Sequence, residues 1–187
     1  YQGCTLATEF PELDTSKGKS FAYMYENCKS ATSFPVINTS QNNNFQSMYK
    51  NCRTATEFPL IDTGNGTNFN SMYGECISAT SFPLIDTSKG TSFNWMYGYC
   101  KSATSFPQLD TRNGTDFSSM YTNCTNATYI NLITDNMSNL INTFAYCIKL
   151  KKVILSFFRA EAGIDVHETF SECYSLKAVV IRSFNTY

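Results

Sequence analysis

The sequence predicts an α/β solenoid, a stack of strand–turn–short-helix units of about 24 residues with a parallel sheet on one face. Two observations predict it. Cysteines recur at a nearly constant interval, which becomes slightly shorter and then slightly longer near the C-terminus. Within each regular interval a threonine and a proline come first, and aromatic residues precede the next cysteine. The cysteines are Cys4, Cys28, Cys52, Cys76, Cys100, Cys124, Cys147 and Cys173.

Each regular unit begins with a segment that favours extended backbone. The pattern Ala-Thr-x-Phe-Pro occurs five times, for example over residues 79–83. Threonine and phenylalanine favour strands, and proline lacks the N–H that a continuing ladder needs. We therefore expect a short strand that ends at each proline, followed two residues later by an aliphatic core residue such as Ile85.

A turn is predicted after the strand. Asp86 and Thr87 are residue types whose side chains often accept hydrogen bonds from nearby backbone N–H groups, and this favours a turn. Gly90 follows, and glycine or asparagine at this position predicts a left-handed backbone. Thr91 is then a suitable N-cap for a helix. The residues equivalent to Gly90 are Gly18, Asn42, Gly66 and Gly114.

The pattern Phe-x-x-Met-Tyr-x-x-Cys predicts a short helix before each cysteine. In the fourth unit these residues are Phe93, Met96, Tyr97 and Cys100. Offsets of three, four and seven place the side chains on one helical face, which would line the core. Parallel strands joined through helices should coil in the right-handed sense.

The chain is predicted to form one solenoid over residues 1–187. Residues 1–124 contain the regular units, whereas residues 125–187 lose the Phe-Pro and Asp-Thr pairs and form divergent terminal units or a cap. Atypical units are expected at a solenoid end, where an apolar face must be closed. We expect the chain to be a fragment or a processed product, because Tyr1 already lies inside a unit.

The recurring apolar residues predict a buried ladder. Stacked cysteines one unit apart have Cα separations that a disulfide tolerates, so some bridging stays open beside a ladder of buried thiols. Zinc binding is disfavoured, because the cysteines never form a close C-x-x-C pair and His167 is the single histidine. The ladder comprises Cys28, Cys52, Cys76, Cys100, Cys124, Phe34, Phe58, Phe82, Phe106, Met72, Met96, Tyr73 and Tyr97.

The loop and the aromatic segment resemble a known family. Residues 82–100, FPLIDTSKGTSFNWMYGYC, are similar to BspA-like leucine-rich-repeat surface proteins, in particular the Mycoplasma-type variant with an LPxxDTS loop and an MFxxC helix. The last two units resemble the commoner BspA form. The resemblance implies a leucine-rich-repeat-type stack and a role in adhesion or surface recognition, without a shared binding site.

Composition disfavours several functional classes. The net charge is −1 with no long run of one sign, so nucleic acid is not an expected partner. No apolar run approaches the roughly 20 residues of a membrane span, so direct membrane insertion is not expected. We expect no enzyme activity, no metal and no cofactor, because one histidine and a column of equivalent carboxylates make a poor catalytic site. Calcium binding in the Asp-Thr loops stays open.

The outward side of the predicted strands is the best candidate for a binding surface. A threonine recurs in successive units beside a variable polar residue. Threonine also fits a sheet surface without any binding role, so both interpretations stand. The candidate residues are Thr32, Ser33, Thr56, Glu57, Thr80, Ser81, Thr104, Ser105, Thr128 and Tyr129.

Two further features have open interpretations. Trp95 is the single tryptophan, at a position that is serine in several units, so it predicts either an outward contact or a partly buried ring beside Tyr99. Lysines gather towards the C-terminus on the strand side, where we interpret them as a solvated end. They are Lys149, Lys151, Lys152 and Lys177.

Together these features predict a non-enzymatic extracellular binding or adhesion module of a bacterial surface or of a phage or appendage tip. The expected partner is a protein or glycan on a host or cell surface, and the expected location is extracellular, on a cell or a virion. The alternative is a structural spacer or a self-assembling subunit of such an appendage, so self-association stays open.

Overall fold

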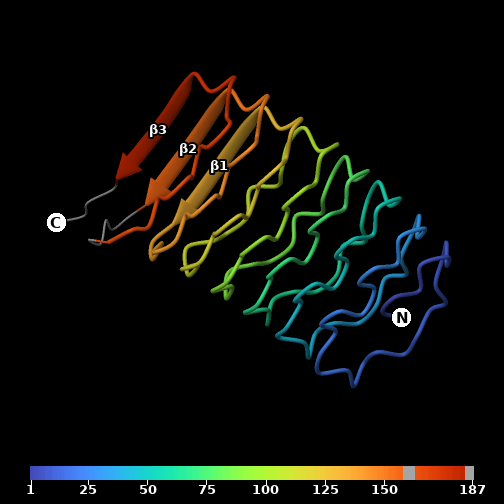
Figure 1. Ribbon diagram of the computed structural model, residues 1–187. Helices are drawn as coiled ribbons and strands as arrows, with labels where there is room; N and C mark the ends of the chain where they lie inside the picture. The colour runs from blue at the N-terminus through green and yellow to red at the C-terminus, as the bar shows by residue number, and fades with distance from the viewer. Residues whose placement is uncertain (158–162, 184–187) are drawn as a thin grey trace.

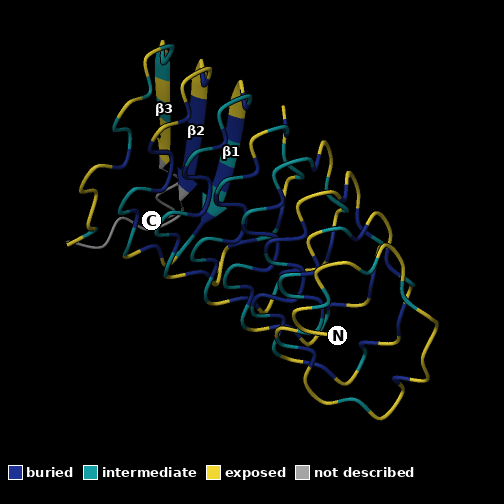
Figure 2. Ribbon diagram, turned by 45° about the vertical axis from the view of Figure 1, so that its right-hand side comes forward, coloured by how far each residue is buried: buried dark blue, intermediate teal, exposed yellow. Residues whose placement is uncertain are grey.

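The computed structural model describes residues 1–157 and 163–183. The backbone winds into a stack of coils, with the N-terminus at one end and the C-terminus at the other (Figure 1). Hydrogen bonds join residues that are one sequence unit apart, such as Tyr73 N and Met96 O, so each coil lies directly against the next. Buried residues line the inside of the coils and exposed residues the outside (Figure 2). The described residues therefore share one continuous core.

Three parallel strands lie in the C-terminal coils: β1 (Tyr129–Thr134), β2 (Lys152–Phe157) and β3 (Ala178–Ser183). They form one sheet in the order β1-β2-β3. Leu132, Leu155 and Ile181 are partners in register across the sheet. The predicted parallel sheet is thus confirmed in this part of the chain.

The prediction of a strand before every proline is wrong for the regular coils in the described residues. Their Ala-Thr-x-Phe segments make few backbone bonds to the coil before, such as Thr32 N to Thr8 O and Thr80 N to Thr56 O. The proline that follows has no N–H to donate, so pairing stops there. The three strands form in coils that lack this proline.

The spacing of the inward-facing residues also prevents a regular strand in these coils, in addition to the proline. In the second coil the inward residues are Phe34, Ile37 and Thr39, at offsets of zero, three and five. A strand alternates with a period of two, so this spacing contains one extra residue, which acts like a bulge.

The strand β1 lacks that extra residue. Its inward residues are Ile130, Leu132 and Thr134, at offsets of zero, two and four, which is strict alternation. The interval between Cys124 and Cys147 is correspondingly shorter, by a single position, than the interval between Cys100 and Cys124. Loss of this position and of the proline together explains why a regular sheet begins here.

The prediction of short helices is also wrong, because the described residues contain none. The aromatic segment folds instead as two successive four-residue turns. In the second coil Cys52 N donates to Tyr49 O across one such turn. The third residue of each turn, Ser47 and Asn51, has a positive φ of 52° and 61° respectively. A type II turn requires this conformation at its third residue.

The geometry of these turns explains why the pattern imitates a helix. Each four-residue turn buries its first and fourth residues, so two turns give inward offsets of zero, three, four and seven. A helix gives the same offsets. A helix this short would gain little stability by itself, because isolated helices shorter than about 12–15 residues are only marginally stable in water. In the turns, alternate N–H groups bond to the next coil instead, for example Tyr49 N to Met72 O at 2.9 Å and Asn51 N to Gly74 O at 2.7 Å.

The recurring glycines permit close packing. The prediction that they have left-handed backbone is wrong, because among the described residues the glycines with positive φ are Gly3 and Gly163. A Cβ at Gly66 would lie 2.5 Å from Phe69 Cζ and 2.9 Å from Phe45 Cε2. Aromatic rings therefore press directly against the glycine backbone.

The expected threonine N-caps join coils instead of capping helices. The Thr91 hydroxyl donates to Thr67 O of the preceding coil at 3.2 Å, and the Thr115 hydroxyl donates to Thr91 O at the same distance. A column of exposed threonines therefore contributes to the coil-to-coil contacts.

Aromatic rings fill the core as three parallel ladders. Neighbouring rings in the tyrosine ladder stack with centroids 5.5–5.8 Å apart. Each such pair contributes about 0.5–1.5 kcal/mol beyond the area that it buries. The ladders are Tyr25, Tyr49, Tyr73, Tyr97, Tyr121 and Phe144; Phe45, Phe69, Phe93 and Phe117; and Phe10, Phe34, Phe58, Phe82 and Phe106.

The residues of the expected ladder lie inside the coils. Its cysteines, methionines and tyrosines have no exposed surface, and Phe34 and Phe58 are buried. Phe82 and Phe106 are partly buried against the same core.

The thiols form a bonded column without disulfides. All eight cysteines are free. Cys76 Sγ donates to Tyr49 O at 3.1 Å, and Cys100 Sγ donates to Tyr73 O at 3.2 Å in the preceding coil. Burial raises the pKa of these thiols, that of Cys147 to about 12. The column therefore consists of protonated thiols.

The Asp-Thr pairs form the predicted turns and also join coils. Asp86 Oδ1 accepts a bond from Ser88 N at 2.9 Å, and bonds from Ser88 lower the pKa of this carboxyl group. The buried Thr87 hydroxyl donates to Asp110 O of the next coil at 2.7 Å. One residue thus shapes the turn and its neighbour holds the stack together.

Adding a methyl group at Gly66 should destabilise the fold. In the Gly66→Ala variant the methyl group would overlap Phe69 and Phe45, so we expect a loss of about 1–3 kcal/mol in the free energy of unfolding. Gly64→Ala is the matched control in the same coil, because its Cβ would lie 3.3 Å from Asp86 Oδ2. Urea unfolding followed by circular dichroism compares the two, and equal losses would contradict this packing.

Two buried hydroxyl groups should differ in their contribution to stability. Thr87→Val removes a bonded hydroxyl and should lower the free energy of unfolding by about 1–3 kcal/mol. The Tyr73 hydroxyl is buried without a hydrogen-bond partner among the described residues. Tyr73→Phe keeps the stacked ring, so it should change stability by less than about 0.5 kcal/mol or increase it. Denaturant titration of both variants tests this ranking, and the reverse order would refute it.

Thiol reactivity should follow burial. A chromogenic disulfide reagent at pH 8 should react quickly with Cys4, which is partly exposed, and more slowly with Cys173, which is also partly exposed but whose pKa is raised by burial. The other cysteines should react only after denaturant is added, because their raised pKa keeps the reactive thiolate scarce. Rapid labelling of most thiols in the folded protein would be incompatible with the buried column.

Candidate binding surfaces

The ten candidate residues form one exposed surface along the stack, which we name the threonine face. Every one of them is exposed, although Phe34 and Phe58 beside them point inward. The residues of the threonine face are Thr32, Ser33, Thr56, Glu57, Thr80, Ser81, Thr104, Ser105, Thr128 and Tyr129.

The threonine column continues as lysine in the last coils. Thr128 N lies 3.4 Å from Thr104 O, and the next bonds in the same column are Lys151 N to Thr128 O and Lys177 N to Lys151 O. In the adjacent column Tyr129 is the register partner of Lys152. Lys151, Lys152 and Lys177 therefore extend the threonine face and are exposed on it.

A row of exposed aliphatic side chains borders the threonine face, and the sequence pattern alone did not reveal it. Val36, Leu60 and Leu84 are 72%, 63% and 65% exposed; we name them the aliphatic column. Each follows a proline, where the extra residue of the regular coil turns its side chain outward. The sequence did contain one signal of this exposure. The residue after the proline is Glu12 in one coil and Gln108 in another, and charged and amide side chains are mostly exposed.

The threonine face contains a shallow hollow of about 180 Å³. Glu57 is the single charged residue in its lining, which includes no histidine. The hollow therefore offers a place for a side chain of a partner but no pair of groups for acid–base chemistry. It is lined by Thr32, Ser33, Phe34, Glu57, Phe58 and Pro59.

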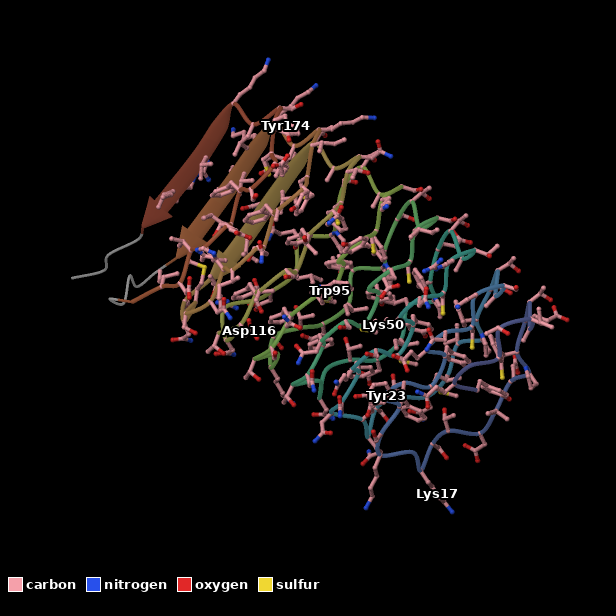
Figure 3. The ribbon with its side chains drawn as sticks, in the orientation of Figure 1. Lys17, Tyr23, Lys50, Trp95, Asp116 and Tyr174 are labelled. Carbon is pink, nitrogen blue, oxygen red and sulfur yellow. The ribbon has the colours of Figure 1, made fainter. Side chains whose placement is uncertain are left out.

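The aromatic segments form the opposite side of each coil. The Phe34 and Tyr49 rings meet across the core with centroids 4.9 Å apart, so the two segments face one another. Trp95 belongs to one of these aromatic segments and lies in the middle of the stack (Figure 3). Its ring is half-buried and its centroid is 5.3 Å from that of Tyr99.

Other candidate sites gain no support from the geometry. Within residues 1–157 and 163–183, no group of three or more His, Cys, Asp or Glu side chains is placed to hold a metal ion. The loop carboxylates bond to their own turns, as Asp62 does with Gly64 N at 3.0 Å. His167 is exposed, with Nε2 3.5 Å from Glu168. The described part of the chain has no helix long and apolar enough to cross a membrane.

The chain matches the model of a family described as "Mycoplasma protein of unknown function, DUF285" over residues 2–82 and 20–132. These two matches together span more than half of the sequence. The chain belongs to this family. No curated protein matches the DUF285 chain.

Among solved structures, the DUF285 chain is similar to the crystal structure of a leucine-rich repeat protein from Bacteroides ovatus. The identity is 16% and the TM-score is 0.30, and the match covers 97% of this chain and 62% of that chain. A TM-score of 0.30 does not establish a common shape, so the architecture rests on the hydrogen bonds and packing described above.

Proposed function

We propose that this DUF285 chain is a non-enzymatic binding module that contacts a partner protein through the threonine face and the aliphatic column. The observation that carries this proposal is the aliphatic column, in which Val36, Leu60 and Leu84 recur one per coil and are mostly exposed. Exposed apolar rows rimmed by polar residues are typical of protein contact surfaces.

The energetics favour a protein over a glycan on this face. Fully burying a valine or leucine side chain stabilises a complex by about 1.5–3 kcal/mol. A partner that covers Leu60 and Leu84 would gain this burial free energy. Thr56 and Ser81 at the rim would exchange their hydrogen bonds to water for hydrogen bonds to the partner. Glycans expose mainly hydroxyl groups and would leave the aliphatic side chains poorly covered.

The charges on the face would orient the partner. Glu57 lies in the regular coils, whereas Lys151, Lys152 and Lys177 extend the same columns at the C-terminal end. Complementary charges set orientation and association rate more than affinity. A partner with acidic residues towards the lysine end would therefore dock in one direction.

The location that we propose is the outer surface of a cell or a virion. The resemblance of residues 82–100 to surface repeat proteins supports it. The absence of an acid–base pair in the described hollow on the threonine face supports binding without catalysis.

Replacing the aliphatic column should weaken binding while leaving the fold intact. The native chain should bind at least one member of a panel of purified extracellular matrix and plasma proteins on a sensor chip. The triple variant Val36→Ser, Leu60→Ser, Leu84→Ser should bind that protein at least about tenfold more weakly, because it loses the apolar centre of the interface. Circular dichroism should show no change in the fold, since the three side chains are already exposed.

The matched control replaces exposed apolar residues elsewhere. Val166→Ser combined with Tyr174→Ser removes side chains that are 59% and 78% exposed away from the aliphatic column, and it should bind normally. Undiminished binding by the triple variant would reject the aliphatic column as the interface. If light scattering instead showed oligomers that the triple variant abolishes, the occupant of this face would be a second copy of the chain.

A further inference from the structure

The far side of the stack has a second hollow, of about 460 Å³, which we name the tryptophan hollow. Its lining comes from the aromatic segments and from the residues that directly follow the cysteines, and it includes no residue of the threonine face. Figure 3 shows Trp95 and Lys50 near one another in the middle of the stack, and Lys50 Nζ is 5.7 Å from the centre of the indole ring. The hollow is lined by Arg53, Glu75, Ile77, Trp95, Tyr99 and Lys101.

Departures from the repeat build an aromatic platform at this place. Trp95 occupies a position that is Ser71 in the preceding coil and Ser119 in the following one. A Cβ at Gly98 would lie 3.1 Å from indole Cδ2, and one at Gly74 would lie 3.5 Å from Cε3. The two glycines therefore let the indole lie close to the backbone of two successive coils.

Three residues of the hollow have left-handed backbone. Glu75, Trp95 and Tyr99 have φ values of 61°, 58° and 63°. Asparagine adopts this conformation more readily than bulky residues do, and Asn51 and Asn123 occupy the position equivalent to Glu75 and Tyr99 in other coils. The conformation itself recurs at the equivalent positions of the other coils, so what is particular to this place is the large side chains that it presents.

Cations surround the aromatic rings. Lys50 lies over Trp95, and Lys101 Nζ is 5.6 Å from the centre of the Tyr99 ring. With Arg53 there are three positive side chains around the hollow and one negative side chain, Glu75. The local charge therefore complements a ligand with a small net negative charge.

The polar groups keep hydrogen-bonding capacity for a ligand. Arg53 Nε donates to Asn51 Oδ1 at 2.6 Å, which orients the guanidinium group. Its Nη2 is 3.6 Å from Glu75 Oε2, and Lys50 Nζ is 4.0 Å from Oε1. Both distances exceed a hydrogen bond, so these pairs are held near one another without saturating the donors or the acceptors.

We propose that the tryptophan hollow binds an acidic saccharide whose sugar ring carries one carboxylate. The C–H face of the ring packs on the indole of Trp95 in place of Lys50, whose ammonium group then pairs with the sugar carboxylate. The sugar carboxylate accepts N–H bonds from the planar guanidinium of Arg53, which suits that geometry. The hydroxyl groups of the ring donate to the Glu75 carboxylate.

The same contacts disfavour other ligands. A neutral sugar would displace Lys50 and Lys101 from the ring faces without giving their ammonium groups a new partner. A polyanion would carry more negative charges than the three cations around the hollow can pair, and Glu75 would repel those nearest to it. A peptide that bound by strand addition would need free backbone groups, but Trp95 N and Tyr99 N already donate to the next coil.

The fluorescence of Trp95 provides a direct test, because it is the only tryptophan of the chain. Titration with the disaccharide glucuronyl-N-acetylglucosamine should change the emission in a saturable way. The same disaccharide with its carboxyl group reduced to an alcohol should bind at least tenfold more weakly. Absence of a saturable change with the acidic disaccharide would overturn the proposal, and so would equal affinity for the reduced form.

Variants locate the site independently. Arg53→Gln should weaken binding about tenfold, while Arg112→Gln, at an exposed arginine that pairs with Asp110, should not. Trp95→Ser uses the residue of the equivalent positions, so it should fold normally and abolish the heat of binding in calorimetry. Normal binding by Arg53→Gln, or tighter binding of heparin or tetraglutamate than of the disaccharide, would refute this ligand.

The tryptophan hollow and the aliphatic column should act independently. The triple variant of the aliphatic column should bind the acidic disaccharide with unchanged affinity, because none of the three replaced residues lines the tryptophan hollow. A loss of saccharide binding in that variant would contradict the separate sites.

Discussion

Hydrogen bonds between successive coils are the constraint on which the rest of the structure depends. In the aromatic segments alternate N–H groups bond to carbonyl groups of the next coil, as Tyr97 N does with Met120 O. This register sets each residue against its equivalent in the next coil. A side chain that recurs in the sequence therefore becomes a column in space: rings stack on rings, thiols bond to the preceding coil, and buried threonines bond to the following one. Stability then accumulates from contacts between neighbouring coils, as expected of a repeat protein.

The same register imposes local costs that the stack must offset. Two residues per coil adopt left-handed backbone, as Ser71 and Glu75 do with φ of 56° and 61°. Such conformations cost about 1–3 kcal/mol each and persist only where the surroundings enforce them. Here the N–H groups of Ser71 and Glu75 donate to Asn94 O and Gly98 O of the next coil, which holds the turns in place. Glycine serves a different purpose, because Gly66 leaves room for the rings that pass over it.

A stack held in this way presents outward side chains in preset positions, which reduces the ordering required on binding. The two surfaces proposed for binding use this property differently. The aliphatic column repeats one residue type over several coils and suits an extended protein contact. The tryptophan hollow arises where large side chains replace the smaller residues of equivalent positions, so it provides one local site with specific polar groups. Since no residue of the aliphatic column lines the tryptophan hollow, a ligand at one surface need not disturb the other.

The sequence by itself determined the period, the inward residues, the Asp-Thr turns and the residues of the threonine face, because each depends on local spacing or on local side-chain chemistry. It could not distinguish turns from helices, since both bury residues at offsets of zero, three, four and seven. Where strands form became clear only from the tertiary structure. The pairing of neighbouring coils shows that a regular sheet needs coils without the proline and without the extra residue beside it. The tertiary structure also decided the tryptophan hollow: Arg53, Glu75 and Trp95 are about one coil apart in the chain, and only the coil-to-coil register brings them together.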